Sequence, residues 1–161
     1  MRKITLLFAL VFTSIVMAQV TTVPGIIQKG YDGEVTIIFN PNEGNKGMAG
    51  ASKCYAHTGL ITSASSNDGD WKHVVEGWRT NTAKTQLTKD GANWKVFIPN
   101  IYAYYNCPTT TEIKKIAFVF HDGAGGSKEG KTADGKDIFV ELADKGLAVS
   151  INEFAEITSL N

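Results

Sequence analysis

Short alternating segments, separated by stretches rich in Gly, Asn, Asp and Ser, constrain the fold of this chain most strongly. In residues 114–120, Ile116, Phe118 and Phe120 alternate with the residues between them, which is the period of a β-strand with one buried face. Further segments of this kind lie at residues 35–39, 54–61, 71–75, 86–88, 94–98 and 138–142. No segment has a convincing helical period. The sequence therefore predicts an all-β fold, an antiparallel immunoglobulin-like β-sandwich of about seven strands.

Two local signals refine this prediction. The turn-forming residues of 89–93 lie between two strand segments, which is typical of a β-hairpin. In the second arm of this hairpin, Trp94 shares a face with two aliphatic residues, so we expect it in the core. Residues 101–107 are dense in aromatic side chains and predict a helical turn that packs over the end of the sheet.

The first eighteen residues are expected to be a signal peptide. Arg2 and Lys3 precede an almost wholly apolar run, and Val16-Met17-Ala18 has the small-residue pattern of a cleavage site. The apolar run is shorter than the roughly 18 residues that a membrane-spanning helix needs. We therefore expect cleavage after Ala18 and no membrane insertion of the mature chain. The protein is then exported to the periplasm, the cell surface or the medium.

The mature chain of about 143 residues is long enough for one domain. Residues 19–32 are expected to be a lead-in segment, and residues 33–143 the sandwich. Residues 144–161 hold another alternating run at 147–151. That run predicts either an edge strand or the start of a next domain that this chain lacks.

Charge and cysteine content restrict the possible partners. Without Arg2 and Lys3, 14 of the 16 basic residues remain against 16 acidic residues, so the formal charge is −2. This balance gives no reason to expect nucleic acid or an anionic membrane as a partner, and we expect a monomer. In an exported protein Cys54 and Cys107 have two possible states. They form a disulfide that stabilises the fold by about 4 kcal/mol, or they are two buried thiols.

The sequence carries no recognisable motif for catalysis. It contains no G-x-S-x-G, H-E-x-x-H or Cys-x-x-Cys pattern. The three histidines, His57, His73 and His121, are dispersed and lack the spacing of zinc ligands. Residues 67–70 and 134–137 are rich in Asp and Gly but lack the terminal Glu of a calcium loop. We therefore predict a protein that is not an enzyme and binds no metal or cofactor.

Residues 54–78 hold the best candidates for a binding surface. Tyr55 and His57 share one face of a predicted strand, which points either to a ligand or to the core. A polar loop then ends at Trp71 and Lys72, and Trp78 follows. Flat aromatic faces with polar neighbours suit a sugar ring, which has an apolar C–H face and a rim of hydroxyl groups. We expect Trp71 to be exposed, while Trp78 either extends the surface or, as we favour, packs towards the core.

Three stretches also resemble a known class of module. They read YAHTGLITS from Tyr55, DWKHV from Asp70 and KIAFVFHDGAGGSKEGKTADGKDIFVEL from Lys115. These stretches are similar to the starch-binding β-sandwich modules of carbohydrate-binding module families 25 and 26. The similarity is closer still to the N-terminal module of exported bacterial α-amylase-family proteins, and it covers residues 35–142.

The resemblance implies a function and a set of contacts. It implies that Tyr55 or His57, together with Trp71, packs against successive glucose rings. One departure is visible, because residues 127–130 read Ser-Lys-Glu-Gly where those modules often carry a Trp-Asp pair. The expected function is non-catalytic binding of an α-glucan such as starch or malto-oligosaccharide, as a module of an exported amylase-type protein. The alternatives are a structural immunoglobulin-like spacer or adhesion domain without sugar binding, and a hydrolase in its own right.

Overall fold

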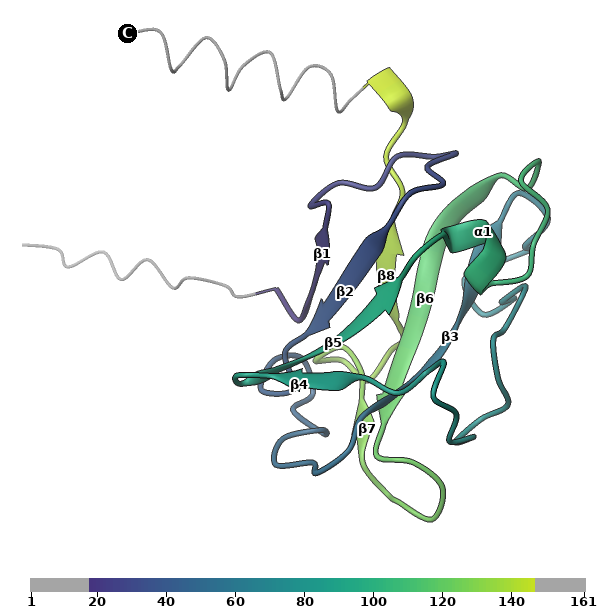
Figure 1. Cartoon of the computed structure of the whole chain (residues 1–161). Helices are drawn as coiled ribbons and strands as arrows, with labels where there is room; N and C mark the ends of the chain where they lie inside the picture. The colour runs from purple at the N-terminus through teal and green to yellow at the C-terminus, as the bar shows by residue number, and fades with distance from the viewer. Residues whose placement is uncertain (1–17, 147–161) are drawn as a thin grey trace, which may run out of the picture.

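Eight strands form two antiparallel sheets that lie face to face in the computed structural model, which describes residues 18–146 (Figure 1). The strands are β1 (Val20–Val23), β2 (Val35–Phe39), β3 (Tyr55–Thr62), β4 (Thr88–Asp90), β5 (Asn93–Ile98), β6 (Ile113–His121), β7 (Glu129–Gly130) and β8 (Ile138–Glu141). The predicted all-β antiparallel sandwich is confirmed, with eight strands instead of about seven. The expected cleavage signal before Ala18 and the alternating run at 147–151 lie outside the described residues.

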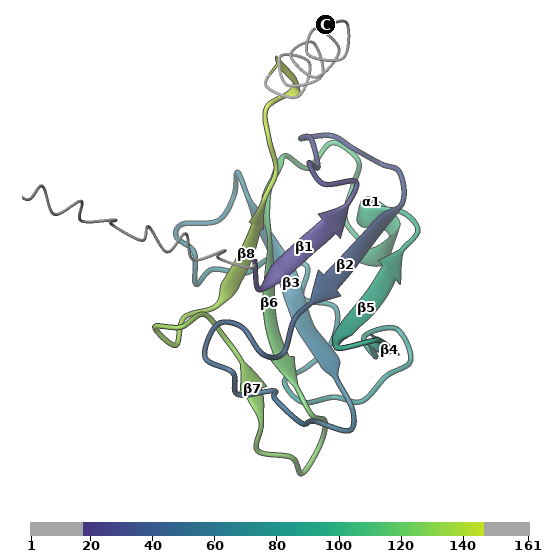
Figure 2. The same cartoon turned by 90° about the vertical axis from the view of Figure 1, so that its left-hand side faces the viewer.

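The two sheets form separate layers (Figure 2). One sheet has the order β1-β2-β5-β4. In the other sheet, β6 pairs with β3 along one edge and with β8 and β7 along the opposite edge. The long strands β3 and β6 thus form the centre of this second layer.

The core lies between the sheets and is built mainly from alternate residues of β2, β3, β5 and β6. The fully buried side chains include Val35, Ile37 and Phe39 from β2, and Ile116, Phe118 and Phe120 from β6. The rings of Phe39 and Phe120 stack with their centroids 3.9 Å apart, which joins the two layers. Trp94 is 4% exposed, so its predicted place in the core is confirmed.

A short helix, α1 (Ile101–Tyr104), closes one end of the sandwich as the aromatic segment predicted. The side chain of Asn100 caps it by accepting a 2.8 Å hydrogen bond from the backbone N–H of Ala103. Just after the helix, the buried hydroxyl of Tyr105 lies 2.7 Å from Thr58 Oγ1. Thr58 donates its own proton to the carbonyl oxygen of Ala117, so the Tyr105 hydroxyl is the donor to Thr58.

Three segments differ from the prediction. β7 was not predicted, and only its two residues, Glu129 and Gly130, pair with β6. β1 lies in the expected lead-in segment, where it pairs with β2 from Val20↔Phe39 onwards. None of its residues is fully buried, so it lacks the apolar alternation of a half-buried strand. Residues 71–75 are not a strand but make a single bridge, between Lys72 and Leu60. His73 follows with φ of 51°, and this left-handed conformation is incompatible with continued strand pairing.

Candidate functional site

The outer face of β3 and β6 carries the two strand residues of the predicted binding surface. Tyr55 pairs with His121, and His57 pairs with Val119. These four side chains share the face opposite the core, because alternate residues of a strand point to opposite sides. Tyr55 is only 6% exposed and stacks on His121 with the ring centroids 5.7 Å apart. Tyr55 therefore supports the surface from below, while the half-buried His57 reaches it.

The loop after β3 folds back over this outer face and brings Trp71 onto it. Backbone hydrogen bonds in both directions between Leu60 and Lys72, of 2.8 and 2.7 Å, fasten the end of the loop to β3. The half-buried ring of Trp71 then stacks on His57, with the centroids 5.4 Å apart and the planes inclined by 25°. Its indole N–H donates to the carbonyl oxygen of Asp68 at 3.0 Å. The loop thus fixes the orientation of the Trp71 ring.

Lys72 lies beside Trp71, but its ammonium group is engaged within the loop. Lys72 Nζ lies 2.7 Å from Asp70 Oδ1. Asp70 also accepts hydrogen bonds from the backbone N–H and the hydroxyl of Ser66. The hydrogen bond from Lys72 and those from Ser66 together lower the pKa of Asp70. The first role of Lys72 is therefore to order the loop that carries Trp71.

Trp78 lies on the surface, so the favoured expectation that it packs towards the core is wrong. Its side chain is 46% exposed. Its ring meets His57 edge-on at 5.2 Å between centroids, and it meets His121 at 5.3 Å with a 60° tilt. His73 and Arg79, with φ of 51° and 57°, flank the segment in left-handed conformations. These turns carry Trp78 across the outer face of the sheet, away from the core.

Arg79 holds the site together and was not singled out from the sequence. Its guanidinium group donates to Asp122 Oδ1 at 3.1 Å and, at 3.3 Å each, to Glu129 Oε1 and the carbonyl oxygens of Gly123 and Lys128. The guanidinium carbon also lies 5.2 Å from the centroid of the Trp78 ring, within the range of a cation–π contact. Arg79 therefore fixes the loop after β6 and supports Trp78. One signal was available in the sequence: Arg79 is the only arginine besides Arg2, and it directly follows a tryptophan.

These side chains surround a hollow of about 280 Å³, which we call the aromatic hollow. It is lined by His57, Trp71, Trp78, Val119, Gly69, Lys131 and Asp137. Of the predicted binding residues, the structure brings His57, Trp71 and Trp78 together here. Tyr55 lies two residues from His57 along β3, and Lys72 lies in the adjoining loop.

The imidazole groups at the site are neutral at pH 7. Burial lowers the pKa of His57, although the backbone of Glu76 and the charge of Asp137 act in the opposite direction. Burial and then the nearby charge of Arg79 lower the pKa of His121 to about 4. The Nδ1 atom of His57 is buried and has no hydrogen-bond partner among the described residues. The aromatic hollow therefore presents uncharged rings between a lysine and an aspartate.

The remaining sequence expectations concern cysteines, metals and membranes. Cys54 and Cys107 are free, buried thiols, and burial raises the pKa of both. Within residues 18–146, no group of three or more His, Cys, Asp or Glu side chains is placed to hold a metal ion. No helix in the same range is long and apolar enough to cross a membrane.

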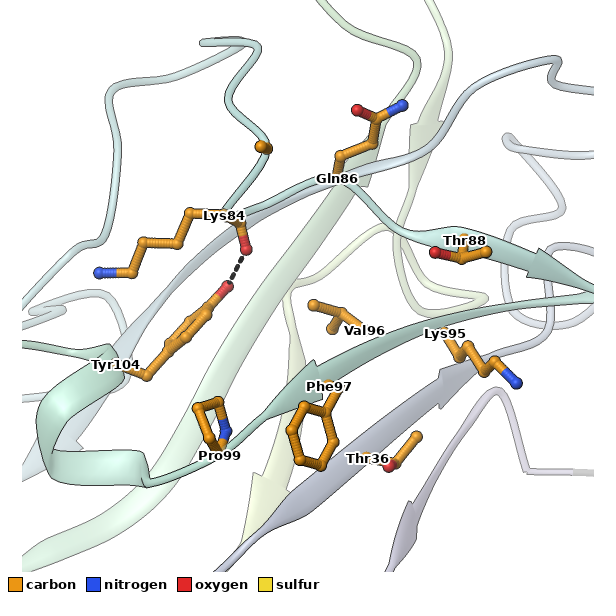
Figure 3. Close-up of a pocket in the computed structure, with 10 residues that line it drawn as sticks. Thr36, Lys84, Gln86, Thr88, Lys95, Val96, Phe97, Pro99 and Tyr104 are labelled. Atoms are coloured by element: carbon orange, nitrogen blue, oxygen red, sulfur yellow. Dashed lines mark hydrogen bonds between the residues drawn. The ribbon is translucent and has the colours of Figure 1, made fainter.

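A larger hollow, of about 670 Å³, lies at the edge of the other sheet (Figure 3). It lies where the chain before β4 diverges from β5, and Phe97, Pro99 and Tyr104 form its apolar part (Figure 3). Tyr104 donates from its hydroxyl to the carbonyl oxygen of Lys84 at 2.8 Å, which ties the two sides together. None of the predicted binding residues lines this larger hollow. Phe97, which is 54% exposed, is its one strongly exposed ring, and no second exposed ring lines the hollow beside it.

Comparison with known proteins found that no family model matches the chain and that no curated protein matches it in sequence. The similarity of residues 35–142 to starch-binding modules thus stays a hypothesis from the sequence. What the geometry defines is an open surface site made of two tryptophans and a histidine on the outer face of a β-sheet.

Proposed function

We propose that this protein binds carbohydrate without chemically changing it, and that its ligand is an α-glucan such as starch or a malto-oligosaccharide. The observation that carries this proposal is the exposed ring of Trp78 beside Trp71 and His57 in one open hollow. Neighbouring aromatic rings at a surface leave a continuous apolar area in water, and such patches are typical of binding sites.

The chemistry of the aromatic hollow suits a neutral sugar. A pyranose ring offers an apolar C–H face to the indole rings and hydroxyl groups to polar neighbours. Lys131 and Asp137 provide a donor and an acceptor at the rim of the hollow. Lys131 Nζ also lies 3.4 Å from Glu129 Oε2, so its charge is already balanced within the protein. An anionic ligand would have to compete with this carboxylate.

Two carboxylates near the site, Asp70 and Asp122, do not suit the acid catalyst of a glycosidase. A glycosidase needs a carboxylic acid whose pKa is raised, so that it can protonate the leaving group. Asp70 has a lowered pKa, as described above. Burial acts to raise the pKa of Asp122, but hydrogen bonds from Arg79 and from backbone N–H groups outweigh it, and the pKa is lowered. Both groups remain ionised at neutral pH and are poor general acids.

Titration with maltoheptaose and native electrophoresis in starch-containing gels test the proposal. Trp78→Ala and Trp71→Ala should each weaken binding about tenfold, which corresponds to the loss of roughly 1.4 kcal/mol of contact energy. Phe97→Ala is the matched control, because it removes an exposed ring from the other sheet and should leave the affinity unchanged.

Three outcomes would contradict the proposal. The wild-type protein does not bind maltoheptaose, the two tryptophan variants bind like the wild type, or reducing ends accumulate when pure protein is incubated with starch. The first outcome favours a structural spacer or adhesion domain, and the last favours a hydrolase.

A further inference from the structure

A second hollow adjoins the aromatic hollow and continues the site across the sheet. It measures about 290 Å³ and is lined by Asp68, Gly69, Lys136, Asp137 and Phe139. We call it the Phe139 hollow. Gly69 and Asp137 also line the aromatic hollow, so the two hollows meet at this pair of residues. Gly69 has no side chain to obstruct the passage between them.

Phe139 points to the same side of the sheet as His57. In the pairing of the strands, Phe139 of β8 lies opposite Ala117 of β6, two residues along β6 from Val119, which lies opposite His57. Residues two apart on a strand share a face, as do directly paired residues. Two strand spacings and a two-residue shift place the Cα atoms of His57 and Phe139 about 12 Å apart across the sheet. This span exceeds the length of one sugar ring.

The ring of Phe139 is held in place by charged neighbours. The ammonium group of Lys115 lies 5.2 Å from the ring centroid. Lys115 is fixed in turn by Asp68 and Glu141, each at 3.1 Å. Phe139 is thus a second oriented aromatic residue on the outer face, carried by a strand and not by a loop.

The lysines that line the two hollows, Lys131 and Lys136, are each paired with a carboxylate. Lys136 Nζ lies 2.7 Å from Asp134 Oδ2, just as Lys131 lies beside Glu129. Such paired groups can still bond to hydroxyl groups but attract a charged ligand only weakly. This balance favours a neutral chain over an acidic polysaccharide.

We propose that the ligand is a linear oligosaccharide or polysaccharide segment that occupies both hollows, with a further contact at Phe139. This inference rests on the proposed function, since it extends the same site. One sugar unit lies against Trp78 and Trp71, the chain passes between Gly69 and Asp137, and a later unit contacts Phe139. The site thereby selects longer chains over short ones.

Affinity as a function of chain length tests this proposal. Maltose, maltotriose and maltoheptaose are titrated against the wild type, Phe139→Leu and the matched control Phe97→Leu. Leucine keeps an apolar side chain on β8 but removes the flat ring. For the wild type we expect affinity to rise from maltotriose to maltoheptaose. In Phe139→Leu, maltoheptaose should bind about threefold to tenfold more weakly, while maltose binds unchanged. Phe97→Leu should match the wild type with all three sugars, and thermal unfolding should verify that both variants are folded.

The possible failures are distinguishable. If the wild type binds no malto-oligosaccharide, the proposed function falls, and the Phe139 contact falls with it. If the wild type binds maltoheptaose and Trp78→Ala weakens this binding about tenfold, the function stands. The Phe139 proposal is then overturned when Phe139→Leu binds maltoheptaose like the wild type, or when it weakens maltose and maltoheptaose equally.

Discussion

Replacing Arg79 with alanine should destabilise the fold more than replacing any exposed lysine. The substitution removes four hydrogen bonds that fasten the loop after β6, two of them to carboxylates. It also removes the guanidinium group from the face of Trp78. Asp122 keeps hydrogen bonds from backbone N–H groups, including that of Lys128 at 3.2 Å, but loses its ion-pair partner.

The expected size of the effect follows from how buried the ion pair is. The side chains of Arg79 and Asp122 are 18% and 20% exposed. Breaking a fully buried pair costs about 3–5 kcal/mol, whereas an exposed pair contributes at most about 1 kcal/mol. We therefore expect Arg79→Ala to lower the free energy of unfolding by about 2–3 kcal/mol at pH 7. Arg79→Lys should restore only part of the lost free energy of unfolding, because an ammonium group lacks the planar set of N–H donors with which a guanidinium group reaches several acceptors at once.

The same interaction makes the effect depend on pH. The folded protein holds the pKa of Asp122 below its ordinary value, so this carboxylate stabilises the fold above the unfolded pKa of about 3.9. That contribution is lost as the pH falls through the folded pKa. The difference between wild type and Arg79→Ala should thus be complete at pH 7 and should shrink below about pH 4.

Urea unfolding followed by circular dichroism at pH 7 and pH 3 measures both effects. At pH 7 the unfolding midpoint of Arg79→Ala should fall by about 1 M. Lys95→Ala is the control, because Lys95 makes an exposed ion pair with Asp90, with 45% and 56% of the side chains in solvent. It should change the free energy of unfolding by less than about 0.5 kcal/mol. Equal midpoints for the two variants at pH 7, or an Arg79→Ala difference that is as large at pH 3, would refute the reasoning.

Two further predictions concern the core. Trp94→Ala should lower the free energy of unfolding by about 3–5 kcal/mol, because it leaves a cavity in the core. Trp78→Ala should lower it by less than half as much, because the Trp78 ring is already 46% exposed. Equal losses of the two variants in urea unfolding would contradict the placement of Trp94 in the core and of Trp78 on the surface. Thr58→Val should cost about 1–3 kcal/mol, because the buried Tyr105 hydroxyl loses its acceptor. In the Thr58→Val background, Tyr105→Phe should lower the free energy of unfolding by less than it does in the wild type. If the two losses simply add in the double-mutant cycle, the Thr58–Tyr105 hydrogen bond does not contribute as argued.

The strands that build the core could be predicted from the sequence, because burial on one side imposes a period of two. Residues 116–120 and 94–98 show this pattern, and β6 and β5 lie there. β1 was not predicted, because it is an edge strand without fully buried residues and therefore lacks the alternation of apolar and polar side chains. The segment at 71–75 has the composition of a strand, but the left-handed backbone at His73 prevents pairing beyond one bridge.

The site was harder to predict than the fold, because loops assemble most of it. His57 and Trp71, which the sequence analysis placed on one candidate surface, stack on one another. The exposure of Trp78 could not be read from its spacing to Trp71, since two left-handed residues decide where the segment runs. Arg79 gains its role only from acceptors 43 to 50 residues further along the chain. A sequence read locally cannot show which distant backbone carbonyls a guanidinium group will meet.

Because β3 contributes to both the core and the proposed binding surface, the proposed ligand binding would also report how the strands are aligned. Ala56, Thr58 and Leu60 of β3 are buried, while His57, between them, reaches the aromatic hollow. A slip of one residue between β3 and β6 would exchange the two sets, turning the imidazole inwards and an aliphatic side chain outwards. A misaligned chain would therefore lose the proposed sugar site and the core together. If the protein binds α-glucan as proposed, retention on a starch column would separate correctly aligned molecules from misaligned ones, even when both contain the same amount of β-structure.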